Sequence, residues 1–379
     1  MRRNRGLIAV LAAAAAVVAF AIASIVLRPE APVATGSPSI APPITIVPRI
    51  LYAHHVVLDT VPGGGAVTTD AYDSFEIETA GRPRQTHAIA GVAMGTPIFD
   101  GHGRVAYWRV PSMTRSLEIA GPFDLVVWDI QTDRDRVLLT LRDEGPGGTL
   151  LWSADGKSIA ATTRAGPATG RDTLARLLVI DVDNGATRML GAPAVQPVAP
   201  IFADAQIVAG VRGGSYVVLD ATTGAVRTQT AMRVPSTFLV ESAELASSPD
   251  GTVLELHRRF ESEAGPLWIW SVRDPATDIA KVDARGISEP AFWPGRTEVV
   301  FTGPTGVSAV DYRTGRTRTL VSPPGVTFVV AVESGGRFAL VRRGAGLEIV
   351  ERIDDDLKVR PDLQLIVGST LSPLGIVFP

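Results

Sequence analysis

Short apolar runs alternate with short polar turns along most of the chain, from residue 49 to residue 379. Within the runs, apolar and polar positions alternate with a period of two, or the run is apolar throughout. This pattern is typical of β-strands, whereas an amphipathic helix repeats every 3.6 residues. Many of the turns contain Asp-Gly, Asn-Gly or Thr-Gly, and glycine supplies the positive φ that tight hairpins need. The pattern therefore predicts an all-β domain over residues 49–379.

One phrase recurs seven times in this domain: an apolar or aromatic residue, a short turn, and then an apolar strand. Its clearest copies are LWSADGKSIAA (151–161) and ASSPDGTVLEL (246–256). The other copies are IFDGHGRVAYW (98–108), IFADAQIVAG (201–210), AFWPGRTEVVF (291–301), AVESGGRFALV (331–341) and TLSPLGIVF (370–378). Equivalent positions lie between 39 and 53 residues apart. A recurrence at this spacing indicates a repeat protein.

A second phrase also recurs seven times, between copies of the first: an apolar strand, usually an acidic residue, a turn, and another strand. Its copies lie at residues 74–89, 125–139, 177–190, 216–229, 267–280, 307–320 and 347–359. The acidic residues of this phrase include Asp129, Asp181, Asp220 and Asp311. Because they recur at one position of the repeat, we expect them to accept hydrogen bonds from the backbone N–H groups of their own turns.

The two phrases together supply four strands per repeat, and a four-stranded sheet cannot cover its own faces. Stacking the sheets radially buries those faces and limits the exposed edges. The chain begins with the second phrase and ends with the first, so we expect the last strand, near Ile376, to join the first strands, near Leu51. The sequence predicts a β-propeller of seven four-stranded blades closed in this way. Six blades is the alternative count, and a β-sandwich pair or a solenoid is the alternative fold.

The best copies of the first phrase carry a family resemblance. The W-S-x-D-G-K pattern at Trp152–Lys157 and the S-P-D-G pattern at Ser248–Gly251 resemble those of TolB-type, WD-repeat-like β-propellers. The resemblance covers residues from about 49 to 379, and the remaining copies have diverged. It implies a domain that docks protein partners in the cell envelope, and it implies no particular binding residue in this chain.

The N-terminus has the features of a membrane segment. Arg2, Arg3 and Arg5 precede 22 uncharged residues, 6–27, which span about 30 Å as a helix and so match a bilayer core. We expect residues 1–28 to hold a cytoplasmic stub and one transmembrane helix in a bacterial cell membrane, with the propeller outside the cytoplasm. The alternative is a signal peptide cleaved near Ala23, which would release the domain. Residues 29–48 are rich in proline and predict an extended linker.

Charge and composition narrow the classes of partner. The net charge is −3, and it becomes −7 when the four arginines before residue 29 are left out. An acidic domain of this kind is unsuited to nucleic acid, which is bound through Lys and Arg on phosphates. The chain has no cysteine, so disulfides, thiolate metal sites and cysteine nucleophiles are excluded.

No motif for a nucleophilic serine, a metal or a cofactor is present, and we expect no cofactor. Each of the five histidines is expected to be an ordinary surface or turn residue, and Asp354–Asp356 is expected to form a turn. The six tryptophans are expected in the core between blades, with a ligand-lining position for Trp268 and Trp270 as the alternative.

The sequence thus favours a scaffold without catalysis, which binds a protein or peptide partner or an envelope ligand. The alternatives are a sensor subunit of a membrane complex or an enzyme, such as a lyase, glycosidase or quinoprotein, with its site in the central funnel. Funnel or rim residues would come from the turns of the first phrase. The candidates are Asp100, His102, Asp155, Asp204 and Asp250.

Overall fold

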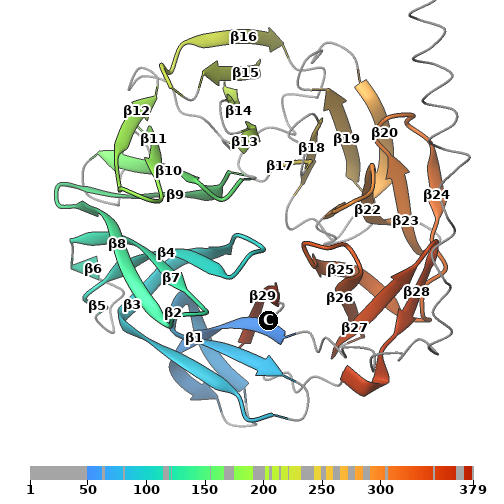
Figure 1. Cartoon of the computed structure of the whole chain (residues 1–379), viewed down its shortest axis with the longest axis horizontal. Helices are drawn as coiled ribbons and strands as arrows, with labels where there is room; N and C mark the ends of the chain where they lie inside the picture. The colour runs from blue at the N-terminus through green and yellow to red at the C-terminus, as the bar shows by residue number, and fades with distance from the viewer. Residues whose placement is uncertain are drawn as a thin grey trace, which may run out of the picture. The chain divides into compact units, whose positions relative to one another are not determined.

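The computed structural model consists almost entirely of antiparallel β-strands (Figure 1). The described residues are 49–61, 65–79, 82–113, 119–120, 122–153, 155–165, 175–190, 201–204, 207–212, 215–220, 222–231, 243–248, 253–258, 265–271, 278–284, 291–303, 306–344, 346–363 and 371–377. They all belong to one compact unit, Ile46–Pro379. The expected membrane helix, the linker 29–48 and Asp250 lie outside the described residues. In the part of the chain that is described, no helix is both long and apolar enough to cross a membrane.

Five sheets each contain four strands that are consecutive in the chain and paired in order. The first of these sheets contains β9 (Glu144–Trp152), β10 (Ser158–Ala165), β11 (Ala175–Asp181) and β12 (Thr187–Leu190). The second contains β13 (Ile201–Asp204), β14 (Ile207–Arg212), β15 (Ser215–Asp220) and β16 (Val226–Ala231). The third is β17 (Ala243–Ser247), β18 (Val253–Arg258), β19 (Gly265–Ser271) and β20 (Asp278–Ala284). The fourth contains β21 (Ala291–Trp293), β22 (Glu298–Gly303), β23 (Gly306–Asp311) and β24 (Thr317–Thr319). The fifth contains β25 (Val326–Val332), β26 (Phe338–Arg343), β27 (Gly346–Ile353) and β28 (Asp356–Val359).

The first part of the chain forms a larger sheet of seven strands, in the order β29-β1-β2-β3-β4-β7-β8. Its strands are β29 (Leu371–Val377), β1 (Arg49–Val61), β2 (Gly65–Thr79), β3 (Gln85–Phe99), β4 (Arg104–Val110), β7 (Phe123–Asp129) and β8 (Arg134–Leu141). The remaining elements are a short hairpin, β5 (Ser112–Met113) with β6 (Ile119–Ala120), and a turn of 3₁₀ helix, η2 (Pro361–Leu363).

The seven-stranded sheet arises because β3 serves two repeats at once. Residues 85–88 pair with β2 alone, residues 93 and 94 pair with both β2 and β4, and residues 98 and 99 pair with β4 alone. The strand bends at Gly91, where φ is +120° and a Cβ would lie 2.2 Å from the carbonyl oxygen of Val110. Only glycine fits such a position. The sequence repeats predicted that the two halves of β3 belong to separate blades. The structure differs from this prediction, because β3 is one strand that both repeats share.

The two ends of the described chain are paired, because β29 is hydrogen-bonded along the edge of β1. Ile50 lies opposite Ile376 and Leu51 opposite Gly375. On its other side β29 contacts β25 of the last sheet. Each remaining sheet also contacts the next one along the chain, through β3 and β9, β9 and β13, β13 and β17, β20 and β22, and β21 and β25.

The hydrophobic cores lie between neighbouring sheets. One core joins Ala106 and Leu125 to Ile159 and Ile180 of the next sheet. The last two sheets enclose another core, which contains Trp293. Five of the six tryptophans are buried: Trp108, Trp128, Trp268, Trp270 and Trp293. Trp268 and Trp270, which had a ligand-lining position as the alternative, are thus core residues. Among the described residues, these shared cores give neighbouring sheets the apolar contact that their faces need.

The structure confirms the predicted role of the recurring hairpin acids. Asp129 accepts the backbone N–H of Thr132, and the other three accept N–H groups from their own turns in the same way. The backbone N–H donors in those turns are Asp183 and Asn184, Thr222 and Thr223, and Arg313 and Thr314. The acid triplet also forms the expected turn, since Asp354, at φ +55°, and Asp355 connect β27 to β28.

Candidate functional site

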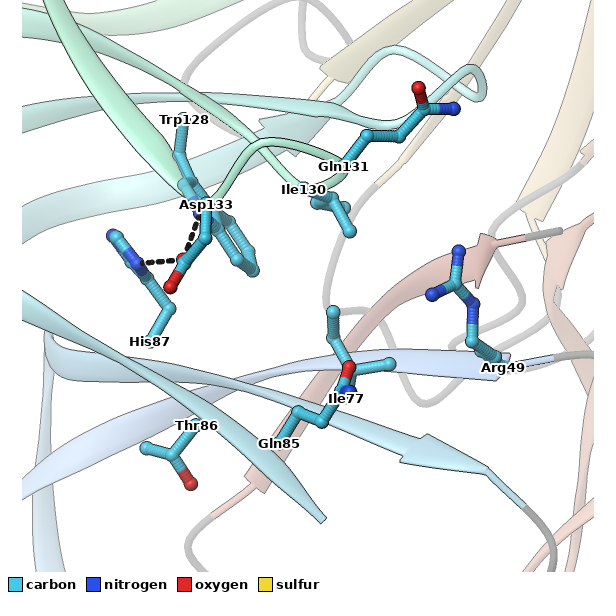
Figure 2. A pocket seen from close by; sticks show the side chains of 9 residues that line it. All are labelled: Arg49, Ile77, Gln85, Thr86, His87, Trp128, Ile130, Gln131 and Asp133. Atoms are coloured by element: carbon cyan, nitrogen blue, oxygen red, sulfur yellow. Dashed lines mark hydrogen bonds and ion pairs between the residues drawn. The ribbon is translucent and has the colours of Figure 1, made fainter. Parts of the chain in front are cut away.

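A recess of about 590 Å³ lies between β3 and the turn that joins β7 to β8 (Figure 2). Three apolar side chains and six polar ones line it. The lining residues are Arg49, Ile77, Gln85, Thr86, His87, Trp128, Ile130, Gln131 and Asp133. The recess therefore lies where the shared strand β3 passes from one repeat to the next.

His87 stands in the wall of this recess because of its place on β3. It pairs across the sheet with Phe75 of β2, and the two rings are stacked with centroids 6.3 Å apart. Its other neighbour is the indole of Trp128 on β7, at 4.4 Å. Only 12% of the His87 side chain is exposed. Packing against these two aromatic rings fixes the direction of the imidazole toward the β7–β8 turn.

Asp133 reaches His87 from an unusual backbone conformation. In the equivalent turns of three other repeats, the left-handed position is occupied by Gly185, Gly224 and Gly315, with φ between +70° and +74°. Asp133 holds the same position with φ +51°. A residue with a side chain is strained there by about 1–2 kcal/mol, although aspartate tolerates it better than most. The turn thus carries a carboxylate in place of the glycine that favours its shape.

Both imidazole nitrogens of His87 face carboxylates (Figure 2 draws the first pair). Nδ1 lies 2.7 Å from Asp133 Oδ1, and Nε2 lies 3.2 Å from Asp135 Oδ1. A neutral imidazole has a single N–H donor, so two carboxylate acceptors require the doubly protonated, charged ring. Burial lowers the pKa of His87, but the hydrogen bonds to Asp135 and Asp133 outweigh burial and raise that pKa above its ordinary value.

The two carboxylates have further partners. Asp133 Oδ1 accepts a hydrogen bond from the indole N–H of Trp128 at 3.0 Å, and this bond, together with that to His87, lowers the pKa of Asp133. Asp135 accepts the hydroxyl of Tyr107 at 3.0 Å and lies 3.6 Å from a guanidinium nitrogen of Arg109. Burial, followed by the charge of Asp135, raises the pKa of Tyr107. The phenol therefore stays neutral and donates a hydrogen bond to the carboxylate of Asp135.

Arg49 lies across the recess from His87 and Asp133, with Ile77 and Ile130 between them (Figure 2). Burial and the nearby charge of Arg82 lower the pKa of Arg49. Gln85, Thr86 and Gln131 are exposed on the rim, and their side chains make no hydrogen bond within the described part of the chain. The recess thus presents a cation at one end, the carboxylate of Asp133 at the other, and amide groups at its edge.

This arrangement favours binding over proton transfer. Both nitrogens of His87 are engaged by carboxylates, so neither is positioned as a free general base. Trp128 is buried between its neighbours and offers little of its ring face to a ligand. Among the described side chains, no group of three or more His, Asp or Glu residues has the geometry to hold a metal ion. Side-chain amides, a hydroxyl and charged ends are the groups that recognise a polar ligand.

The structure places the residues predicted from the first phrase in their separate turns. Asp100 is buried and accepts the N–H groups of His102 and Arg104, while His102 itself is exposed. Asp155 is exposed and accepts the hydroxyl of Ser153 and the N–H of Lys157. Burial raises the pKa of Asp155, but these two hydrogen bonds outweigh burial, so the pKa lies below its ordinary value.

Two of these turns are in contact. Arg104 donates to Asp100 at 2.7 Å and to the carbonyl of Gly156 at 2.8 Å, next to Asp155. Asp204 ends β13, and its side chain, like the whole of Asp250, lies outside the described residues. Asp100 and Asp155 therefore accept hydrogen bonds from backbone N–H groups of their own turns.

The expectation that His87 is an ordinary surface or turn residue was wrong, because it lies within β3 with a side chain that is 12% exposed. Sequence reasoning also missed Asp133 and Asp135, although one signal was present. The copy of the second phrase at residues 125–139 contains the stretch WDIQTDRDR. In this stretch Asp133 takes the position that a glycine holds in the copies at 177–190, 216–229 and 307–320. An aspartate in a glycine position of a repeat is a local departure that often marks a site. His87 carried no such signal, because its partners belong to the next repeat.

No family model matches the chain, and no curated protein matches it. The chain is similar in structure to a Bacteroides uniformis protein named as a candidate 6-phosphogluconolactonase, with a TM-score of 0.50, 12% identity, and coverage of 88% of this chain and 99% of that one. It is also similar to a chain of a mitotic checkpoint complex (TM-score 0.49, 13% identity, 88% of each chain). A third similar structure is TolB from Acinetobacter baumannii (TM-score 0.43, 18% identity, 72% of this chain and 65% of that one).

The described strands form consecutive antiparallel sheets with a β-propeller fold, and TolB is among the structures to which the chain is similar. Identities of this size indicate a shared fold and carry no activity from one protein to another. The fold resemblance that the W-S-x-D-G-K and S-P-D-G patterns suggested is confirmed at this level.

Proposed function

We propose that this chain is a binding scaffold: a seven-bladed β-propeller, closed by β29, that binds a protein or peptide partner outside the cytoplasm of a bacterium. Seven blades are obtained when β3 is divided between two of them. The first blade is then β29-β1-β2 with the start of β3, and the second is the end of β3 with β4-β7-β8. The five four-stranded sheets are the rest.

The observation that supports a binding role is the recess beside His87. Its turn keeps Asp133 in a conformation that suits glycine, and the residue contributes a carboxylate to the recess wall. Local strain that is retained in this way is typical of functional positions. The recess lies on the side of the molecule where β3 and the β7–β8 turn meet, and we assign it as the binding site.

An extended peptide fits the chemistry of this recess. Gln85, Thr86 and His87 are consecutive residues of β3 and all line it, so the strand itself forms one wall. Residues 85–88 pair with β2 on one edge, and no described strand pairs with their other edge. A peptide that lies along this edge would receive main-chain hydrogen bonds from β3 and side-chain hydrogen bonds from Gln85 and Gln131.

Selection of displayed peptides tests this proposal. Random dodecapeptides on phage are selected on the full-length chain in nonionic detergent, with counter-selection on a Gln85→Ala, Gln131→Ala double variant. We expect peptides whose Kd for the native chain is about tenfold lower than their Kd for the variant. This corresponds to a difference in binding free energy of about 1.4 kcal/mol. The matched control is Gln229→Ala, which removes the same exposed side chain from β16. Enrichment only of peptides that bind all three chains equally would refute the assignment.

We further propose that residues 1–28 anchor the chain in the membrane and place the propeller outside the cytoplasm. Because the chain has no cysteine, a single introduced cysteine reports its own location. Arg313 is exposed in the β23–β24 turn, so Arg313→Cys is expected to react with a membrane-impermeant maleimide in intact spheroplasts. Asn4→Cys, in the arginine-rich stub, is expected to react only after lysis. Protection of both cysteines until lysis would contradict the proposed location.

A further inference from the structure

His87 connects two parts of the fold that the backbone leaves separate at this point. It stands on the part of β3 that pairs with β2, while Asp133 and Asp135 belong to the β7–β8 hairpin of the next repeat. Residues 85–88 of β3 form no ladder with β4 or β7. The bonds from His87 to Asp133 and Asp135 therefore hold the hairpin against β3, and the recess lies between these two elements.

The charges around His87 make this connection depend on one proton. Asp133 and Asp135 face it from the hairpin, and Arg109 of β4, which also pairs with Asp124 of β7, reaches Asp135. Tyr107 donates to Asp135, Phe75 of β2 is uncharged, and Arg49 of β1 lies across the recess. If His87 loses its charge, one ring nitrogen presents a lone pair to a carboxylate oxygen. An attraction then becomes a repulsion at hydrogen-bonding distance.

We propose that His87 is a pH-sensitive clamp: its charged imidazolium holds the β7–β8 hairpin against β3, and its deprotonation releases the hairpin and opens the wall of the recess. This regulatory device goes beyond the proposed binding function and does not depend on it. Since the pKa of His87 is raised in the folded chain, the clamp is fully closed below the ordinary histidine pKa and is lost as pH rises through the folded-state pKa.

The indole of Trp128 offers a direct readout. Its N–H donates to Asp133, and the imidazole of His87 is stacked on its ring, so release of the clamp changes both contacts. The full-length chain, labelled with ¹⁵N at histidine and tryptophan, is titrated by NMR from pH 5 to pH 9. His87→Gln and Trp128→Phe variants assign the two signals. We expect His87 to titrate above the ordinary value of about 6.5, and the Trp128 indole resonance to shift with it.

Two variants separate the clamp from general stability. Asp133→Gly places in the turn the residue that three other repeats have there, so it is expected to fold while lowering the His87 midpoint. His87→Gln is expected to abolish the pH-dependent shift of the indole. The matched control is His54→Gln, which removes a partly exposed histidine paired with Asp73 at 3.0 Å and is expected to leave the indole titration unchanged. A His87 midpoint at or below the ordinary value, or an indole resonance that ignores it, would overturn the proposal.

Discussion

Replacing Glu298 with glutamine is expected to lower the free energy of unfolding by about 3–5 kcal/mol, because the change leaves a buried guanidinium without its counter-charge. The side chain of Arg352 on β27 is 0% exposed, and its Nη2 lies 2.6 Å from Glu298 Oε2 on β22. The other carboxylate oxygen of Glu298 accepts Arg318 Nη2 at 2.5 Å. One carboxylate therefore pairs with two guanidinium groups and joins the last two sheets.

The surroundings of Arg352 give it no substitute for this carboxylate. Its guanidinium is stacked 4.5 Å above the ring of the fully buried Trp293, and its Nη1 has no hydrogen-bond partner among the described residues. Burial lowers the pKa of Arg352, and Glu298 opposes this effect. Asp355 lies 3.9 Å from Arg352 and instead accepts a hydrogen bond from Arg318 at 3.0 Å. Loss of the Glu298 charge therefore exposes the desolvation cost of the buried cation.

Urea unfolding of the full-length chain, followed by tryptophan fluorescence, measures the effect. The matched control is Glu348→Gln, which breaks the partly exposed pair with Arg343 and is expected to cost less than about 1 kcal/mol. Adding Arg352→Met to Glu298→Gln is expected to recover part of the loss, because the buried charge is then removed. Equal losses for Glu298→Gln and Glu348→Gln would show that the buried network does not stabilise the fold.

Removal of residues 371–379 is expected to abolish the cooperative unfolding transition. These residues include β29, which covers the edge of β1, where Ile50, Leu51, Tyr52 and Ala53 are fully buried. Losing the buried Ile376 alone is worth about 2–5 kcal/mol, and each lost backbone hydrogen bond adds about 0.5–1.5 kcal/mol. The total approaches the whole stability of an ordinary domain, about 5–15 kcal/mol.

A rearranged chain provides the control for this truncation. Arg49 lies opposite Val377, so a two-residue Asn-Gly turn can join β29 directly to β1 as a hairpin. Inserting residues 371–377 and this turn between Pro48 and Arg49 of the truncated chain is expected to restore the urea transition. A truncated chain that unfolds cooperatively with native stability would show that the β1–β29 pairing contributes little.

Strands and turns could be predicted from the sequence because their causes are local. The period-two alternation marked the strands, and the recurring Asp129, Asp181, Asp220 and Asp311 marked the hairpin turns, whose hydrogen bonds are confirmed. The pairing of residues near Leu51 with those near Ile376 was also expected, because the order of the two phrases left one strand at each end.

The candidate site could not be predicted, because its contacts cross from one repeat to the next. His87 and Asp133 are separated by 46 residues, and their approach depends on how β3 bends at Gly91. The same is true of Glu298 and Arg352, which are 54 residues apart. Nothing in the local pattern of either repeat fixes the angle between neighbouring sheets. The aspartate in the glycine position of the β7–β8 turn was the visible sign.

The shared strand β3 restricts how this chain can have grown or shrunk in evolution. Each of the five four-stranded sheets is a continuous stretch of sequence, so an in-frame duplication or deletion of one leaves whole sheets on either side. A break within β3 instead removes the outer strand of one sheet and the inner strand of the next. We therefore expect the first two repeats to be inherited as a single unit, and changes in the number of repeats to fall among the five four-stranded sheets.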